Sequence, residues 1–319
     1  MKKFLLFLCF CAMLIGCKPQ TKKTVVRVGF FPNITHAHAL VAQCMARHGD
    51  DWFAKRCGAQ VQWFPYNAGP SAMEAILASS IDLTYVGPNP ALNAYQRSKG
   101  EEIRYIAGAV KGGAALVVSQ EIQSAQDLLN KRIATPQLGN TQDVACRLWL
   151  MDQGFAITLQ GGDCEVLPTP NANQLDLFQR GDIAGVWTVE PWVSRLLKDG
   201  NGKILIEQED AITTILVSRR RFLEENQQRV RSFLKAHQEL TQWIRQHPEE
   251  AQQMVVEQIG FLTQGKISSE LVREAWKRLK FDDAPDILGM EAMISGAQRV
   301  GFLEGNIVSL KKFFVNWKP

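Results

Sequence analysis

The segment Asp82-Leu83-Thr84-Tyr85-Val86-Gly87-Pro88-Asn89-Pro90-Ala91-Leu92 decides the fold. A short apolar run of strand length ends at a glycine, and prolines then mark the first turn of a helix. The same strand–turn–helix order recurs upstream from residue 25 and begins again downstream near residue 124. Such alternation predicts an α/β fold with mainly parallel sheets.

Two cycles of this alternation predict two lobes. Residues 25–111 and 212–319 are assigned to the first lobe, and residues 112–211 to the second. The chain crosses between them near Gly112 and again near residue 212, so a two-strand hinge would border a cleft that can close. From Phe222 onward apolar residues recur at helical spacing, and these C-terminal helices are expected to pack on the first lobe.

The N-terminus predicts export. Lys2 and Lys3 precede an apolar run over residues 4–15 that is too short to span a bilayer, which indicates a signal peptide over residues 1–16. Leu14-Ile15-Gly16-Cys17 resembles the bacterial lipobox, which implies lipidation of Cys17 and a tether over residues 17–24. The protein is therefore expected to be a membrane-anchored lipoprotein that faces the periplasm or the extracellular side.

Composition narrows the class of protein. The net charge is only +4 and the basic residues are scattered, so no nucleic-acid partner is expected. The chain lacks a CxxC motif and a His-rich cluster, so neither a metal site nor a cofactor is expected.

Four cysteines remain beyond the expected lipidation site. Their spacing favours two local disulfides, which an exported protein permits, and four free buried thiols are the alternative. The two candidate pairs are Cys44–Cys57 and Cys146–Cys164.

Polar loops follow four of the predicted strands, at residues 32–36, 67–71, 87–90 and 137–141. Ligands of open parallel sheets bind outside the carboxyl ends of the strands. Each loop opens a helix, whose N-terminus presents unpaired N–H groups and a partial positive charge. Several such N-termini directed at one cleft would form an anion site without lysine or arginine.

Several of these segments resemble the nitrate/sulfonate/taurine-type solute-binding proteins of ABC importers, a family that includes binders of thiamine precursors. The matching segments are FPNITH (31–36), DLTYVGPNPAL (82–92), TPQLGNTQD (135–143) with RLWL (147–150), and GDIAGVWTVEPW (181–192). The resemblance covers most of the mature chain, and its Glu-Pro-Trp segment is the most specific part. It implies a periplasmic-binding-protein fold and delivery of a small anionic solute to a permease and its ATPase. The protein is expected to be a monomer and not an enzyme.

The resemblance also implies ligand-binding residues. They are Asn33, Thr35, His36, Gly69, Ser71, Gly87, Asn89, Gly139, Thr141, Trp187 and Glu190. Ser71 and Thr141 would donate to an anionic group, while Trp187 would form an apolar wall unless it is core. The alternative for His36 is a surface histidine without ligand contact, and the alternative for Asn89 and Thr141 is that they only cap helices. Glu190 either contacts the ammonium of a zwitterion or forms a pair between the lobes.

The order of expected solutes is organosulfonate, then nitrate or bicarbonate, then a thiamine precursor. The precursor would need stacked aromatic rings, which Tyr66, Tyr85 and Trp187 could supply. The rival classes are an enzyme of the same fold and a sensor ectodomain. No nucleophile elbow is visible, which disfavours a hydrolase.

Overall fold

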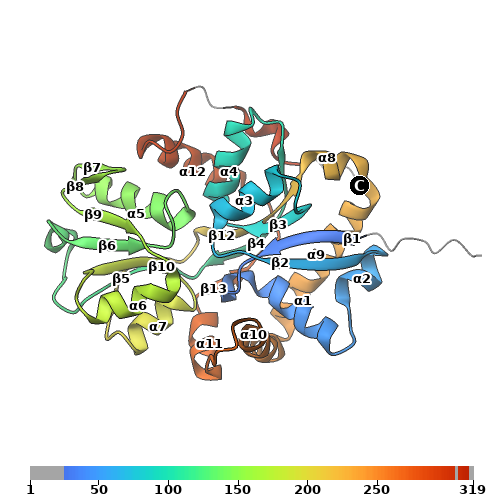
Figure 1. Cartoon of the computed structure of the whole chain (residues 1–319), viewed down its shortest axis with the longest axis horizontal. Coiled ribbons are helices and arrows are strands. Elements are labelled where there is room, and N and C mark those ends of the chain that lie inside the picture. Colours follow the sequence, from blue (N-terminus) through green and yellow to red (C-terminus); the bar gives the residue numbers. More distant parts are fainter. Residues whose placement is uncertain (1–24, 306–307, 316–319) are drawn as a thin grey trace, which may run out of the picture.

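The computed structural model describes residues 25–305 and 308–315, and it is built on two mixed β-sheets with helices on both faces of each (Figure 1). The expected signal peptide, Cys17 and the tether lie outside the described residues.

The larger sheet has the strand order β13-β4-β12-β3-β1-β2. Its parallel part consists of β1 (Val25–Phe30), β2 (Gln60–Pro65) and β3 (Leu83–Val86). Strand β12 (Ile212–Arg219) is antiparallel to β3 and to β4 (Ile103–Gly112), and β13 (Leu279–Phe281) is antiparallel to β4. All four residues of β3 are buried because helices cover both faces, which explains its unbroken apolar run.

The second sheet has the order β11-β5-β10-β6-β9. Strands β6 (Arg132–Thr135), β9 (Glu165–Pro168) and β10 (Gly185–Val189) are parallel. Strand β5 (Ala114–Val118) is antiparallel to β10 and to β11 (Lys203–Gln208). A small hairpin of β7 (Ile157–Thr158) and β8 (Gly161–Gly162) stands apart.

The chain passes from one sheet to the other between β4 and β5 and between β11 and β12. At the first passage Gly112 and Gly113 have φ angles of 73° and 71°, in the left-handed region that favours glycine. A Cβ on Gly112 would lie 2.4 Å from the carbonyl oxygen of Arg278. Both glycines are therefore required by the backbone where the two sheets connect.

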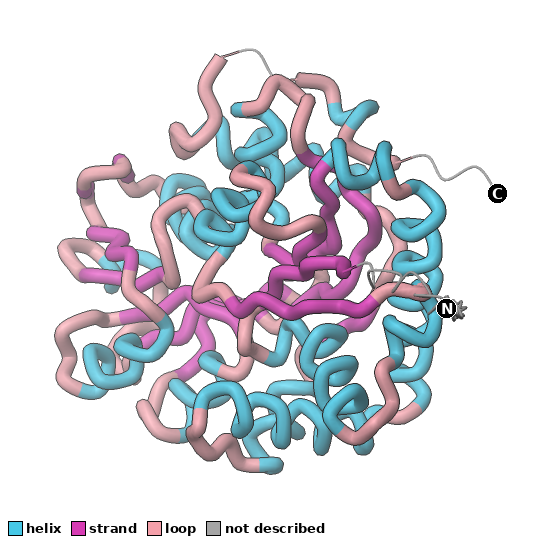
Figure 2. Tube along the Cα trace, turned by 45° about the vertical axis from the view of Figure 1, so that its right-hand side comes forward, coloured by secondary structure: helices cyan, strands magenta, loops and turns pink. Residues whose placement is uncertain are grey.

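Helices of the first lobe form two layers (Figures 1 and 2). One core joins the sheet to α1 (Ala37–Arg47), α2 (Trp52–Cys57), α9 (Gln227–Gln246) and α10 (Pro248–Thr263). The opposite core holds α3 (Gly69–Leu77), α4 (Pro88–Arg97) and α12 (Ile287–Arg299). The short helices η1 (Ile34–His36), α8 (Arg220–Glu225) and η3 (Leu310–Lys312) complete this part of the chain.

The second sheet carries α5 (Thr141–Asp152) on one face and α6 (Asn171–Gln179) with α7 (Trp192–Lys198) on the other, and η2 (Ala125–Leu128) precedes β6. The C-terminal helices pack on the first lobe as expected, but α11 (Ser269–Trp276) and α12 also reach the second. Lys198 pairs with Glu270 of α11 at 2.5 Å, and Arg299 of α12 pairs with Asp152 at 2.6 Å.

All four cysteines of the described residues are free thiols, so the expected disulfides are wrong and the free-thiol alternative holds. Cys44 faces Glu257 of α10, whereas Cys57 lies beside Asn226 and Arg229 at the start of α9, so the two thiols face different helices. Cys146 and Cys164 lie in one apolar core, where burial raises the pKa of Cys164 to about 12.

Among the described residues no helix combines the length and apolar character that crossing a membrane requires.

Candidate functional site

A cavity lies between the two lobes, beside the hinge. Both sheets contribute loops to its wall, and η1, β10 and β12 contribute one or more residues each. The lining residues are Phe31, Asn33, Thr35, His36, Asn67, Ala68, Gly69, Gly87, Pro90, Pro136, Asn140, Thr141, Gln142, Asn171, Val189 and Thr213.

Four helices begin at this cavity. Two belong to the first lobe, where α3 begins at Gly69 and α4 has its N-cap at Gly87. Two belong to the second lobe, where α5 begins at Thr141 and α6 at Asn171. Each helix follows the carboxyl end of a strand, where open α/β sheets place ligands. Their unpaired N–H groups and aligned dipoles therefore give the cavity a positive potential.

Asparagine side chains add further donors. The Oδ1 atom of Asn140 accepts from the backbone N–H of Asp143 at 2.8 Å, which caps α5. The Oδ1 atom of Asn33 accepts from the Thr35 hydroxyl at 2.6 Å, and that of Asn171 accepts from Thr188 at 3.4 Å. Because the oxygen ends are engaged within the protein, the amino ends are left for a bound solute.

His36 is a neutral member of the cavity wall. It is buried, and its Nδ1 accepts from the backbone N–H of Phe31 at 3.2 Å, which leaves the hydrogen on Nε2. Burial lowers the pKa of His36 to about 3. The expectation of a surface histidine is therefore wrong. The cavity lining, which lies wholly within the described residues, includes no Asp, Glu, Lys or Arg.

The carboxylate of Asp143, in the first turn of α5, is fully engaged inside the second lobe. Asp143 is completely buried, and its oxygens accept from Thr135 at 2.8 Å, from the backbone of Gly139 at 2.9 Å and from Arg147 at 3.2 Å. This network fixes the loop that precedes α5 and neutralises the charge of Asp143. The field at the cavity therefore comes mainly from helix N-termini and neutral donors.

The structure brings six of the expected site residues to the cavity: Asn33, Thr35, His36, Gly69, Gly87 and Thr141. The lobes touch at this point, because the Thr141 hydroxyl lies 3.4 Å from the backbone nitrogen of Asn89. Asn89 itself is buried outside the lining, and its Oδ1 has no partner.

Four other expected residues lie elsewhere. Trp187 is core, donating to Gln208 at 3.1 Å and packing on Trp149, so it forms no cavity wall. Ser71 turns back to donate to the carbonyl oxygen of Ala68 at 2.9 Å. Gly139 packs against Phe302, outside the lining.

Glu190 is the fourth, and it forms the pair between lobes. It is completely buried, it accepts from the backbone and hydroxyl of Ser194, and it lies 3.1 Å from Arg278. Burial raises the pKa of Glu190, and the bonds from Ser194 and Arg278 oppose that rise. Its carboxylate therefore supports the hinge region and does not line the cavity.

Sequence reasoning missed several lining residues. Asn171 follows a strand and opens a helix, so the loop rule that located Thr141 would have found it too. Val189 and Thr213 lie in strands β10 and β12, where only the three-dimensional arrangement shows that they face the cavity.

Two lobes connected by a double crossing and enclosing a cavity make this the two-lobed periplasmic-binding-protein fold. The alkanesulfonate-binding protein SsuA from Xanthomonas axonopodis pv. citri, solved bound to MOPS, is similar with a TM-score of 0.75 and 18% identity, over 92% of this chain and 99% of that one. The nitrate-binding protein NrtA from Synechocystis PCC 6803 has a TM-score of 0.71 and 14% identity, over 88% and 83%.

The chain belongs to the NMT1-like family, whose model matches residues 19–260. It is 28% identical over 214 residues to the taurine-binding periplasmic protein of Escherichia coli K12, a match that covers 64% of each chain. It is 26% identical over 213 residues to the putative aliphatic sulfonates-binding protein of Bacillus subtilis 168, over 63% of this chain and 60% of the relative. The matches thus span less than two thirds of these relatives. The family resemblance expected from the motifs is confirmed.

Proposed function

We propose that this protein is the solute-binding component of an ABC importer and that it captures an organosulfonate in the cavity between its lobes. The observation that carries the proposal is the convergence of four helix N-termini and three asparagine side chains on one cavity. Within the described part of the chain, no charged side chain lines that cavity. Neutral donors suit an anion that must later be released, because they avoid a permanent ion pair.

A sulfonate fits both halves of this lining. Its three oxygens can accept from the α3, α4, α5 and α6 N-termini and from the asparagine amino groups. Its organic chain would lie against the apolar side chains of Phe31, Pro90 and Val189. The similarity to a taurine-binding protein and to a putative aliphatic sulfonates-binding protein supports this choice. Nitrate has no organic chain for that apolar wall.

The lining also bears on the choice between sulfonates. Glu190 pairs with Arg278, and no carboxylate of the described residues lines the cavity to meet an ammonium group. Simple alkanesulfonates are therefore expected to bind at least as tightly as taurine.

Capture would proceed by closure of residues 25–111 and 212–319 against residues 112–211. The Gly112-Gly113 passage would act as part of the hinge, and contact between the α4 and α5 N-termini would mark the closed state. The closed protein would deliver its solute to a permease and ATPase from the periplasmic or extracellular side.

A thermal-shift screen of the protein from Thr21 onward tests the solute class. Binding to the folded state alone adds about 2.7 kcal/mol at a solute concentration of 100 Kd, so Tm should rise with alkanesulfonates and taurine. Nitrate, bicarbonate and thiamine precursors form the comparison arms. A rise with one of those classes alone would replace the organosulfonate, and no rise with any would reopen the sensor and enzyme classes.

The proposed lipid anchor rests on the lipobox-like segment that ends at Cys17. Changing Cys17→Ser should move the full-length protein from the membrane fraction to the soluble exported fraction. Continued membrane association of that variant would refute anchoring through this cysteine.

A further inference from the structure

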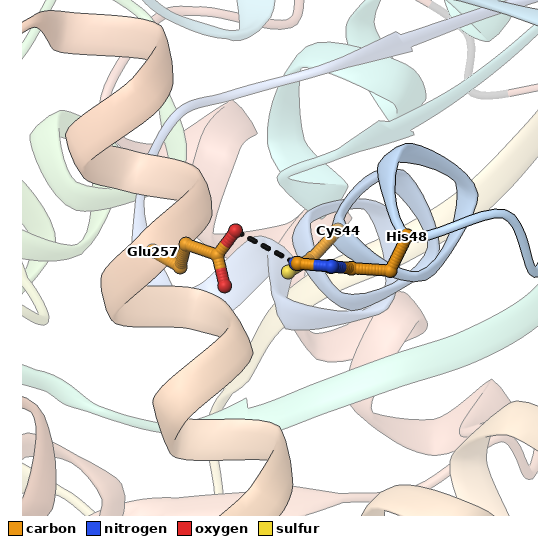
Figure 3. A group of neighbouring side chains, drawn as sticks. All are labelled: Cys44, His48 and Glu257. Carbon is orange, nitrogen blue, oxygen red and sulfur yellow. Dashed lines mark hydrogen bonds and ion pairs between the residues drawn. The ribbon is translucent and has the colours of Figure 1, made fainter.

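Three potential metal ligands meet on the first lobe, away from the cavity, where α1 packs against α10 (Figure 3). Cys44 lies on α1, and His48 caps the C-terminal end of that helix one turn later. Glu257 faces both from α10. The thiol sulfur, an imidazole nitrogen and a carboxylate oxygen all lie within 4.8 Å of one another.

A positively charged side chain, the guanidinium of Arg47, already lies against this cluster. His48 Nε2 and Glu257 Oε1 are 2.8 Å apart, and the Arg47 guanidinium lies 2.6 Å from the same oxygen. The guanidinium is also 3.9 Å from the Cys44 sulfur. The Cys44 side chain is buried, while the His48 and Glu257 side chains are 61% and 46% exposed. One fixed ligand and two adjustable ones would therefore meet an incoming ion.

We propose that Cys44, His48 and Glu257 form a zinc site with a fourth position for water. A thiolate, an imidazole and a carboxylate together favour zinc over magnesium or calcium. Tetrahedral bonds of about 2.0–2.3 Å place ligand atoms about 3.3–3.8 Å apart. The His48–Glu257 contact must therefore lengthen, and the other separations must shorten by about 1.5 Å at most, which rotation of the exposed His48 and Glu257 side chains allows.

Arg47 can yield its place without losing all its contacts. Its Nε donates to Gln258 at 2.9 Å, and its guanidinium lies 4.4 Å from the centre of the Phe261 ring. Both contacts can persist when Glu257 turns to the ion. Because zinc is bound by the thiolate, zinc binding would release the proton of the Cys44 thiol to solvent.

Bound zinc would link α1 to α10 and stabilise the first lobe. None of the three ligands lines the solute cavity, so this site is independent of the proposed transport function. The spacing of Cys44 and His48, four residues apart on one helix, is the sequence signal that a search for CxxC motifs overlooks.

The test is a zinc titration of reduced, untagged protein from Thr21 onward against a chromophoric chelator. One equivalent should bind, and Co²⁺ should give a thiolate-to-metal charge-transfer band. Cys44→Ser should abolish the band, and Glu257→Gln should weaken zinc binding at least about tenfold. Cys57→Ser, at a thiol outside the cluster, should change neither. Arg47→Gln should tighten binding, because it removes the competing cation.

Binding that stays unchanged in Glu257→Gln, or a cobalt band that persists in Cys44→Ser, would overturn the site, as would the absence of stoichiometric binding. Glu257 is exposed enough for its variant to fold, so the result does not depend on tolerance of a change at the buried Cys44.

Discussion

Replacing Gly87 by alanine should weaken solute binding without destabilising the free protein. Gly87 has φ −65° and ψ 148°, which alanine adopts freely, so the backbone carries no penalty. Its new Cβ would lie 2.5 Å from the Thr141 hydroxyl oxygen, on the opposite lobe. A real Cβ contact needs 3.0 Å or more, so the Thr141 side chain must rotate or the lobes must separate by roughly half an ångström or more.

Overpacking of this kind costs about 1–3 kcal/mol. Because the clash exists only between closed lobes, that cost should fall on the liganded state and raise Kd about 5- to 150-fold. Isothermal titration calorimetry with an alkanesulfonate measures the change, and urea unfolding of the free protein should match the parent. An unchanged Kd would refute closure through contact of the α4 and α5 N-termini.

Gly69→Ala is the matched control. Its Cβ would lie 2.3 Å from Pro90, within the same lobe, so it should destabilise the free protein as well. The double change Gly87→Ala with Thr141→Ala removes the clashing oxygen, so the two single effects on Kd should be less than additive.

Two other predictions concern titration and thiols. Burial lowers the pKa of His36 to about 3 and of His237 to about 4, and it also lowers that of His38. The unfolded chain takes up protons near pH 6.5, so stability is full above that pH and falls as pH decreases. His36 and His237 should each cost about 2 kcal/mol at about pH 5, and equal urea midpoints there and at neutral pH would contradict this. Thiol titration of the denatured protein from Thr21 onward should find four free thiols per chain. A count of two or none would show that one or both disulfides form.

The alternation of strands and helices was sufficient to predict the fold, because each strand–helix unit carries its own local signals. Gly87 is the N-cap of α4, and Pro88 begins the helix because its ring fixes φ at a helical value. Both signals are local and can be read from adjacent residues in the sequence. The predicted crossings fall at Gly112 and close to Ile212, where the chain changes sheets. The antiparallel direction of β5 and β11 was not predicted, because strand direction depends on contacts between distant segments. Strand β13, which pairs with β4, was not predicted at all.

The cavity lining was predictable only at the loops that follow the carboxyl ends of parallel strands. Residues at helix N-termini after parallel strands, such as Gly69 and Thr141, do line the cavity. Trp187 and Glu190 were expected there from the family motif, but side-chain direction is decided by tertiary partners. Gln208 and Trp149 hold Trp187 in the core, and Arg278 from a distant part of the chain holds Glu190.

The most direct test of anion capture at the helix N-termini is calorimetric titration of an alkanesulfonate into the parent protein and into Thr141→Val. The valine keeps the shape of Thr141 and removes its hydroxyl, which is the expected donor to the solute and also the acceptor for the backbone N–H of Asn89. A hydrogen bond to a charged group is worth about 1.5–3 kcal/mol, so the parent should bind one equivalent and the variant should bind about 10- to 150-fold more weakly. Equal affinity, or no binding by the parent, would contradict the proposed site.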